Sequence, residues 1–413
     1  MTINNEHNKL NVPNLRFKEF EGEWEKCKLG EIATICGGYA FNSKELSSKK
    51  GLYQVVKMGN LYQNNLDLSR TPSFINYIDS KSNKVLLHYG DIAITLTGTN
   101  NKRDFGYSYM FTTEQNLLLN QRCGLIRTEH NPYFVFNLVK TNSFLNQFFE
   151  SSTGGTGNQA NVSTKSMESF SVYIPKSKEQ RKIADLLRLI DERIATQNKI
   201  IDKLQSLIKG LNDFLYTQYG GEVLTSFAEL GTSYSGLSGK SAQDFGSGKP
   251  FITYLNVYSN NVIKENDFQY VAIKDDEKQN VVKYGDVLFT LSSETPEEVG
   301  VGSVYLGKEK VYLNSFCFGI HITNTEVAFP PYLSYYVSLT AFRKFIYPYA
   351  QGSTRFNLCK ADFEKASIKL PTLADQKRIY SVLGHIDCKI ETERQMLNLY
   401  NSQKQYLLRQ MFI

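Results

Sequence analysis

Residues 176–216 read KSKEQRKIADLLRLIDERIATQNKIIDKLQSLIKGLNDFLY, and their apolar positions alternate steps of four and three. This heptad spacing continues without proline, so it predicts one long helix with a coiled-coil seam. Ser177 and Gln180 predict a capping box at the start of the helix, and Gly220 predicts its end. The seam positions that we select are Ile183, Leu187, Ile190, Ile194, Ile201 and Leu204.

The same pattern returns 196 residues later, near the C-terminus. Pro175 and Gln180 recur as Pro371 and Gln376 at that same offset, which indicates an internal duplication. Because each long helix must bury its apolar stripe, we expect the two to pair as an antiparallel coiled coil with pseudo-twofold symmetry. The seam of the second helix consists of Ile379, Leu383, Ile386, Ile390, Leu397 and Leu407.

The segment before each long helix mixes short β-type runs with turns rich in Gly, Asn and Ser. We expect strands at 52–56 and 91–96, and a helix at 133–149 that opens after a proline. The fold class is therefore α+β, with two similar α/β domains joined by the two long helices. The predicted boundaries are 12–175 and 217–371 for the domains, and 176–216 and 372–413 for the helical segments.

Composition excludes several classes of protein. Lys and Arg number 47 against 41 Asp and Glu, and the net charge of +6 permits a polyanionic partner without requiring one. The six cysteines form no CxxC pair and the five histidines show no zinc spacing, so neither a disulfide scaffold nor a metal site is expected. No run approaches the ~20 apolar residues that span a bilayer, so we expect a cytoplasmic protein without membrane contact.

Phe20, Gly22 and Trp24, followed by LGEI at 29–32, resemble the opening segment of type I restriction-modification specificity subunits. A loop rich in Gly, Ser and Thr before each long helix, and the Pro-x-x-x-x-Gln spacing at 175–180 and 371–376, are similar to that family too. With the duplication, the resemblance covers essentially the whole chain.

The resemblance implies a non-catalytic subunit that recognises a bipartite, asymmetric target in double-stranded DNA. Each target recognition domain would read one half, and the coiled coil would fix the unread spacer. It also implies assembly with two modification subunits, which use S-adenosylmethionine to methylate the N6 of one adenine in each half, and with restriction subunits that use ATP and Mg. This chain itself would bind no cofactor.

Motifs typical of an enzyme are incomplete. FPPY at 329–332 lacks the polar first residue of amino-methyltransferase motifs, and a proline opening a helix explains it better. GSGK at 246–249 is followed by Pro250 where a phosphate loop needs Ser or Thr, so we expect a turn. The alternatives are a coiled-coil scaffold with protein-binding globular ends and a self-contained methyltransferase.

Loops that combine hydrogen-bond donors with flexible backbone are the candidate DNA contacts, because Arg can bond guanine, and Asn or Gln adenine, through two hydrogen bonds. For most of them the alternative is an ordinary solvated turn, and for Arg355 it is an ion pair with Asp362. In the first domain the candidates are Thr97, Gly98, Asn100, Lys102, Arg103, Thr156, Asn158, Gln159 and Asn161, with Tyr39, Lys57 and Asn60 as phosphate or packing contacts. In the second domain they are Ser292, Ser293, Thr295, Ser353, Thr354, Arg355 and Asn357.

Overall fold

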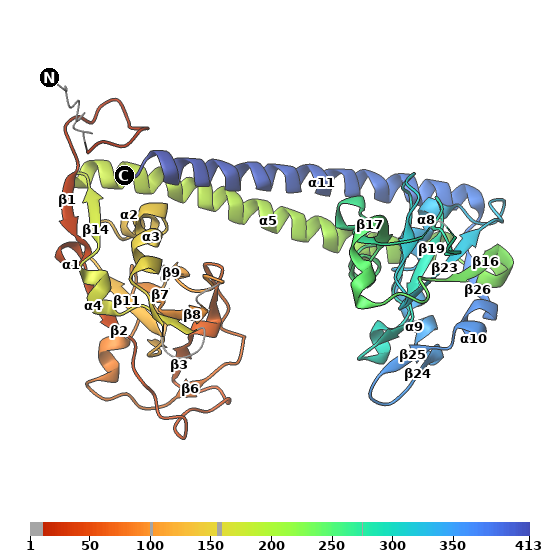
Figure 1. The fold of residues 1–413 in the computed structure, drawn as a ribbon, viewed down its shortest axis with the longest axis horizontal. Coiled ribbons are helices and arrows are strands. Elements are labelled where there is room, and N and C mark those ends of the chain that lie inside the picture. The colour runs from red at the N-terminus through yellow and green to blue at the C-terminus, as the bar shows by residue number, and fades with distance from the viewer. Residues whose placement is uncertain (1–10, 100–101, 155–158, 275) are drawn as a thin grey trace. The chain divides into compact units, whose positions relative to one another are not determined.

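The computed structural model describes residues 11–99, 102–154, 159–274 and 276–413 (Figure 1). The chain forms two compact units. Unit 1 holds the residues up to Gln197 together with Met396–Ile413, and unit 2 holds Asn198–Gln395. Both units mix helices with strands, which confirms the α+β class. Within the described part of the chain, no helix combines the length and the apolar character needed to cross a membrane.

Unit 1 is built around a four-stranded antiparallel sheet in the order β2-β11-β7-β9. Its strands are β2 (Thr34–Gly37), β11 (Cys123–Arg127), β7 (Ile92–Thr95) and β9 (Ser108–Met110). The smaller sheets contain β10 (Leu117–Leu119), β3 (Tyr53–Val56) and β6 (Phe74–Ile75); β12 (Thr153–Gly154), β13 (Gln159–Asn161) and β8 (Thr97–Thr99); β1 (Glu25–Lys28) and β14 (Ser171–Ile174); and β4 (Leu61–Tyr62) and β5 (Asn65–Leu66). Its short helices are α1 (Leu29–Ile32), α2 (Pro132–Leu138), α3 (Asn142–Glu150) and α4 (Thr164–Glu168).

Unit 2 repeats this plan, which confirms the duplication. Its four-stranded sheet contains β16 (Gly231–Ser235), β23 (Cys317–Ile322), β19 (Val287–Thr290) and β21 (Gly302–Val304). The smaller sheets contain β18 (Gln269–Val271), β17 (Phe245–Ile252) and β22 (Tyr312–Leu313); β20 (Ser292–Ser293), β25 (Phe356–Leu358) and β24 (Ala350–Gln351); and β15 (Val223–Thr225) and β26 (Ile368–Leu370). Its short helices are α6 (Phe227–Leu230), α7 (Tyr254–Ser259), α8 (Pro330–Tyr336), α9 (Thr340–Ile346) and α10 (Lys360–Lys365).

The strands predicted at 52–56 and 91–96 are confirmed as β3 and β7. The single helix predicted at 133–149 is wrong, because the segment splits into α2 and α3. Thr141 causes the second start, since its hydroxyl caps α3 by accepting a hydrogen bond from the Phe144 N–H at 3.3 Å. The turn predicted at 246–249 is also wrong. Gly246 and Gly248, each at φ +113°, instead form an irregular section of strand β17.

The two long helices are confirmed as α5 (Ser177–Tyr219) and α11 (Leu373–Gln410). In unit 1 the beginning of α5 shares a core with the end of α11, through Ile183, Leu187 and Ile190 with Leu407 and Met411. In unit 2 the end of α5 shares a core with the beginning of α11, through Ile208, Leu211 and Leu215 with Ile379 and Leu383. Within each unit the two helix segments therefore run antiparallel.

Trp24 and Glu179 fix the opening segment of unit 1 onto its helix pair. The Trp24 side chain is buried, and its Nε1 donates a hydrogen bond to Glu179 at 3.3 Å. Arg16 donates from Nε and Nη2 to the two carboxylate oxygens of Glu179, both at 2.8 Å. The Trp24 ring also meets the rings of Phe134 and Phe412 edge to face. This segment thus joins α2 to the last residues of the chain.

The capping box predicted for Ser177 and Gln180 is wrong, because the Gln180 side chain bonds other residues. Gln376, its counterpart in unit 2, behaves in the same way. The amide of Gln180 donates to the Pro175 carbonyl at 2.8 Å, and its oxygen accepts from the Asn131 N–H at 3.3 Å. Gln376 bonds its own preceding proline and accepts from the Phe329 N–H at 2.7 Å. Each glutamine is buried and links the end of a strand to the start of α2 or α8.

Replacing Gln376 by Ala should destabilise unit 2, because it leaves buried backbone groups of Phe329 and Pro371 without partners. We expect a loss of about 1–3 kcal/mol for each group left unpaired, measured by urea denaturation. Gln403, exposed on α11, provides the matched control Gln403→Ala, which should change the free energy of unfolding by less than about 0.5 kcal/mol. Equal stability of the two variants would contradict the role given to Gln376.

A cluster of charged groups fixes α2 and its neighbours to the helices of unit 1. The Tyr133 hydroxyl donates to Asp191, and the Lys404 Nζ lies 2.5 Å from the other carboxylate oxygen of Asp191. The Lys140 Nζ lies 3.4 Å from the ring centroid of Phe136. Burial, aided by the positive charge of Lys404, lowers the pKa of Lys140 to about 7.

This shift predicts a specific pH dependence of stability. Because the pKa of Lys140 falls from 10.5 to about 7 on folding, the unfolded chain binds more protons between these values, and stability should rise with pH across this window. Lys140→Met should raise the free energy of unfolding below pH 7 and flatten its rise above pH 7. Denaturation as a function of pH measures this, with exposed Lys178→Met as the control. An unchanged slope in Lys140→Met would show that this amine is solvated.

Candidate nucleic-acid interface

In each unit a small three-stranded sheet brings together loops that the sequence separates, and we call it the loop sheet. In unit 1 it consists of β12, β13 and β8, and in unit 2 of β20, β25 and β24. Strand pairing places Thr97 opposite Asn161 in unit 1 and Ser292 opposite Asn357 in unit 2. Most of the candidate contacts predicted from sequence therefore lie on or beside these two equivalent sheets.

In unit 1 the loop sheet presents polar groups on a fixed backbone. Gln159 and Asn161 are exposed, and Thr97 and Gly98 are half-buried. A Cβ on Gly98 would lie 2.6 Å from a carboxylate oxygen of Asp104, so this position needs glycine. That carboxylate accepts hydrogen bonds from the Thr99 N–H at 2.6 Å and the Thr99 hydroxyl at 3.2 Å, and the bonds lower the pKa of Asp104. Three further candidates, Asn100, Thr156 and Asn158, lie outside the described residues.

Lys102 and Arg103 follow β8 and are both exposed. Arg103 adopts a left-handed backbone conformation, with φ +46°, and its guanidinium carbon lies 5.0 Å from the ring centroid of Phe149. Among the residues that the structure describes, Arg103 forms no ion pair. Stacking on a ring orients a guanidinium while leaving its N–H donors available. Arg103 is thus suited to donate to a ligand.

In unit 2 the predicted serines differ from the other candidates, because Ser292 and Ser293 are buried. The Ser293 hydroxyl donates to Glu298 at 3.0 Å, and the Ser292 carbonyl accepts from the Tyr254 hydroxyl at 2.8 Å. These two serines shape the loop sheet from inside, so their prediction as direct contacts is not supported. The remaining candidates are exposed: Thr295, Ser353, Thr354, Arg355 and Asn357.

Arg355 lies beside β25, and its guanidinium carbon is 5.7 Å from the ring centroid of Phe316. The alternative of an ion pair with Asp362 is wrong, because Asp362 instead accepts from the Cys359 thiol at 2.9 Å. Arg355 makes no ion pair within the described ranges. Both units therefore place an unpaired arginine, stacked on an aromatic ring, next to the loop sheet.

The three weaker candidates of unit 1 lie in a supporting layer. Asn60 is buried, accepts from the Lys57 N–H at 2.9 Å, and donates to the carbonyls of Asp67 and Arg70. Of the two roles predicted for Asn60, this burial and these bonds agree with the packing contact rather than with the phosphate contact. The Lys57 amine donates to a serine hydroxyl, and Tyr39 is half-buried. Asn256 of unit 2 is also buried, and its side chain bonds the backbone N–H and carbonyl of Lys264. The recurrence of an asparagine in both units is the sequence signal for this structural role.

Sequence reasoning missed several residues near the loop sheets. In unit 2 a depression of about 700 Å³ is lined by Tyr254, Tyr258, Glu298 and Arg355, among others. In unit 1 the hairpin of β4 and β5 turns through two left-handed residues and exposes Tyr62, 53% accessible. Only the spacing of Tyr254 and Tyr258, four apart on α7, could have suggested one of these features from sequence.

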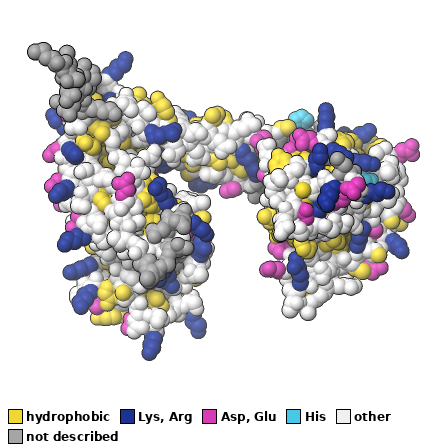
Figure 2. All heavy atoms as spheres, in the orientation of Figure 1, with side chains coloured by type: hydrophobic (Ala, Val, Ile, Leu, Met, Phe, Trp, Pro, Cys, Tyr) yellow, Lys and Arg dark blue, Asp and Glu magenta, His cyan; other side chains and the backbone are white. Residues whose placement is uncertain are grey.

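On the face that Figure 2 shows, Lys and Arg are scattered over unit 1 and intermixed with Asp and Glu on unit 2, so they form no continuous basic stripe on that face.

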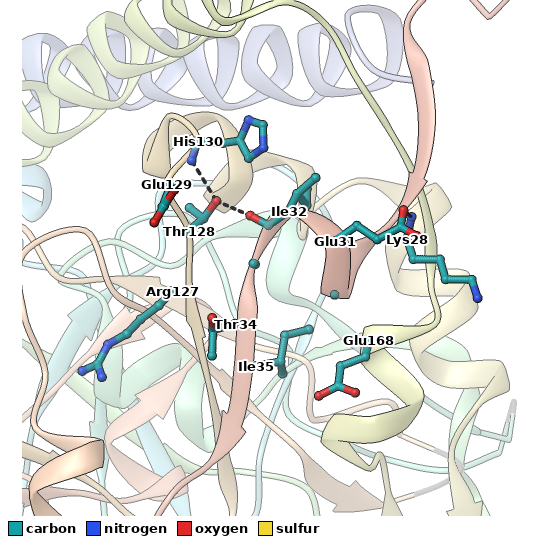
Figure 3. Close-up of a pocket in the computed structure, with 12 residues that line it drawn as sticks. Lys28, Glu31, Ile32, Thr34, Ile35, Arg127, Thr128, Glu129, His130 and Glu168 are labelled. Atoms are coloured by element: carbon teal, nitrogen blue, oxygen red, sulfur yellow. Dashed lines mark hydrogen bonds between the residues drawn. The ribbon is translucent and has the colours of Figure 1, made fainter.

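A second depression, of about 820 Å³, lies in unit 1 next to α1 and β2 (Figure 3). The Thr128 hydroxyl there donates to the Ile32 carbonyl at 2.6 Å and accepts from the His130 N–H at 3.1 Å, as Figure 3 shows. Arg127, which also lines it, is held by Asp91 at 2.8 Å. Thr128 and Arg127, two of the polar residues that line this depression, are thus bonded within the protein and stabilise the fold. In the described part of the chain, no group of three or more His, Cys, Asp or Glu could hold a metal ion.

Comparisons with known proteins agree with this geometry. The type I restriction modification DNA specificity domain matches the chain twice, at residues 21–206 and 231–399. A relative from Methanocaldococcus jannaschii, named as a type I restriction enzyme MjaX specificity subunit, is 24% identical over 412 residues, covering 91% of this chain and 89% of the relative.

Two solved structures share the fold. The S subunit of a type I restriction-modification system from M. genitalium has a TM-score of 0.52 at 13% identity, covering 97% of this chain and 99% of that one. A chain from a structure described as the basis of complex assembly and conformational transition of the type I R-M system has a TM-score of 0.55 at 16% identity, covering 93% and 96%. Because the two domain matches span most of the sequence, the chain belongs to the type I restriction-modification DNA specificity family and is a non-catalytic specificity subunit with two target recognition domains.

Proposed function

We propose that this chain selects the target of a type I restriction-modification enzyme by reading a bipartite, asymmetric sequence in double-stranded DNA. Residues 12–175 form the first target recognition domain and 217–371 the second, with helical segments at 176–216 and 372–413. One observation carries the proposal. Both units expose an asparagine on the loop sheet and an arginine next to it, Asn161 with Arg103 and Asn357 with Arg355.

The chemistry of these side chains fits the major groove. Arg donates two hydrogen bonds to guanine and Asn two bonds to adenine, and each good pair contributes about 1–3 kcal/mol of discrimination. Thr97, Gln159, Thr295, Ser353 and Thr354 surround these residues as further base or phosphate contacts. Exposed Lys102 serves as a phosphate contact that fixes the register of the domain on the duplex, while Lys57 supports the site from inside.

The partners supply the catalysis. Two modification subunits bind S-adenosylmethionine and methylate one adenine N6 in each half-site, and restriction subunits use ATP and Mg to translocate and cleave DNA. The alternative, a scaffold whose globular ends bind only proteins, predicts no dependence on DNA sequence. A mobility shift of the assembled modification complex on duplexes of different sequence separates the two.

The long helices set the number of unread base pairs between the halves. Helix α5 contains 43 residues, which corresponds to roughly 65 Å of axis at 1.5 Å per residue. A stiff element of this kind acts as a spacer because its length changes only with the number of residues.

Methylome sequencing of cells that express this chain with its modification partner tests the main proposal. We expect a bipartite motif with one modified adenine in each half. Arg103→Ala should relax a single position of one half, because only that side chain's base contact is lost. Exposed Lys203→Ala, on the surface of α5, is the control and should leave the motif unchanged. Uniform weakening at all positions would instead make Arg103 a phosphate contact.

Insertion of one heptad into both α5 and α11 tests the spacer. The insertion preserves the seam and adds about 10 Å, so the motif should gain about three unread base pairs at 3.4 Å each. The same methylome measurement reads the result. If the variant is active and the number of unread base pairs in its motif is unchanged, the helices do not set the spacer.

A further inference from the structure

Within the described part of the chain, the Arg355 guanidinium uses none of its hydrogen-bond donors on another side chain. Its side chain is exposed, and the guanidinium carbon lies 5.7 Å from the centroid of the Phe316 ring, itself 54% accessible. An ion pair would also hold the guanidinium, but it would use the N–H groups on the carboxylate. The contact with the Phe316 ring uses the face of the guanidinium, so its N–H donors stay available to a ligand.

Glu298 is a fixed acceptor beside it. The Tyr258 hydroxyl donates to one carboxylate oxygen at 2.8 Å, and the buried Ser293 hydroxyl donates to the other at 3.0 Å. The Tyr258 ring stacks on Tyr254, with centroids 6.0 Å apart and planes 15° from parallel. These bonds lower the pKa of Glu298, so it is ionised at neutral pH. The Thr295 hydroxyl also bonds this carboxylate. Because a carboxylate has about four acceptor positions, one remains for a ligand.

Arg355 and Glu298 line the same depression of unit 2, yet they do not form an ion pair with each other. The negative charge of Glu298, which has no cationic partner among the described residues, is unfavourable next to the phosphates of DNA unless the DNA itself supplies a hydrogen-bond donor to it. In the major groove a G·C pair presents two acceptors, guanine O6 and N7, beside one donor, the cytosine N4 amino group. A guanidinium fork and a separate carboxylate are the complement of this pattern.

We propose that Arg355 and Glu298 together read one G·C base pair in the half-site of unit 2. Arg355 donates to guanine O6 and N7, and Glu298 accepts from the cytosine N4 amino group. An A·T pair keeps the N7 acceptor, but it places the adenine amino group where guanine O6 would be and thymine O4 against Glu298, so one of the two Arg355 bonds and the Glu298 bond would be lost. This proposal rests on the proposed function, because it requires that unit 2 reads DNA.

Unit 1 has an arginine and a carboxylate in a different place. Arg103 lies over Phe149, and the adjacent carboxylate of Asp104 accepts two hydrogen bonds from Thr99. Arg103 follows β8, whereas Arg355 precedes β25, so the two arginines lie beside different strands of the equivalent loop sheets.

The test uses the full chain assembled with its modification subunits. Competition among duplexes carrying each of the four base pairs at every position of the half-site measures discrimination, and the methylome gives the motif. The half read by unit 2 is the one that responds to Arg355→Ala and not to Arg103→Ala. Arg355→Ala and Glu298→Gln should both reduce discrimination at one and the same G·C position, by roughly 5- to 150-fold.

Two variants keep the result decisive. Glu297→Gln, on the same turn but outside the depression, should leave the motif unchanged. Phe316→Leu removes the ring under Arg355 and should weaken discrimination at the same position, even if Glu298→Gln folds poorly. A half-site without a G·C pair, relaxation of two different positions, or relaxation by Glu294→Gln in place of Glu298→Gln would overturn the proposal. A wild-type complex without any sequence-specific methylation would instead refute the proposed function itself.

Discussion

Burial of the heptad seam is the constraint on which the rest of the structure depends. Eight of the twelve seam residues selected from the sequence are buried, and the other four are half-buried. The seam also merges with the core of each unit, since Ile183 and Leu407 belong to the same apolar cluster as Trp24 and Phe134. A recognition domain in either unit is thus packed on the helices through a continuous core rather than tethered by a flexible linker.

Comparison of the two duplicated units shows which contacts both share and which side chains differ between them. Asp191 and Asp387 occupy equivalent positions on the long helices, and each accepts a hydrogen bond from a tyrosine, Tyr133 or Tyr335. The loop sheets keep the same strand pairing, but their side chains differ between the units. Backbone pairing therefore fixes where a contact is presented, while each domain varies which group is presented there.

Local patterns predicted the long helices and the duplication, because heptad spacing and a constant offset are properties of the sequence itself. The errors arose where the partner is distant. Gln180 has the spacing of a capping box, but its oxygen bonds Asn131, far back in the chain. Asn60 and Ser293 resemble solvated loop residues in the sequence, but both are buried in the structure. The Asn60 amide donates to the Asp67 carbonyl, and the Ser293 hydroxyl donates to Glu298. No sequence motif identifies Phe316 or Glu298, because each is defined by a contact that forms on folding. Phe316 lies under Arg355, and Glu298 accepts a hydrogen bond from Tyr258.

Unit 2 is continuous in sequence, from Asn198 to Gln395, whereas unit 1 is completed by Met396–Ile413. During synthesis, therefore, the domain that leaves the ribosome second can finish folding first. The rings of Trp24 and Phe134 can pack on Phe412 only after residue 412 has been synthesised. Until then, the apolar surface around these two rings lacks part of the core that covers it in the folded unit.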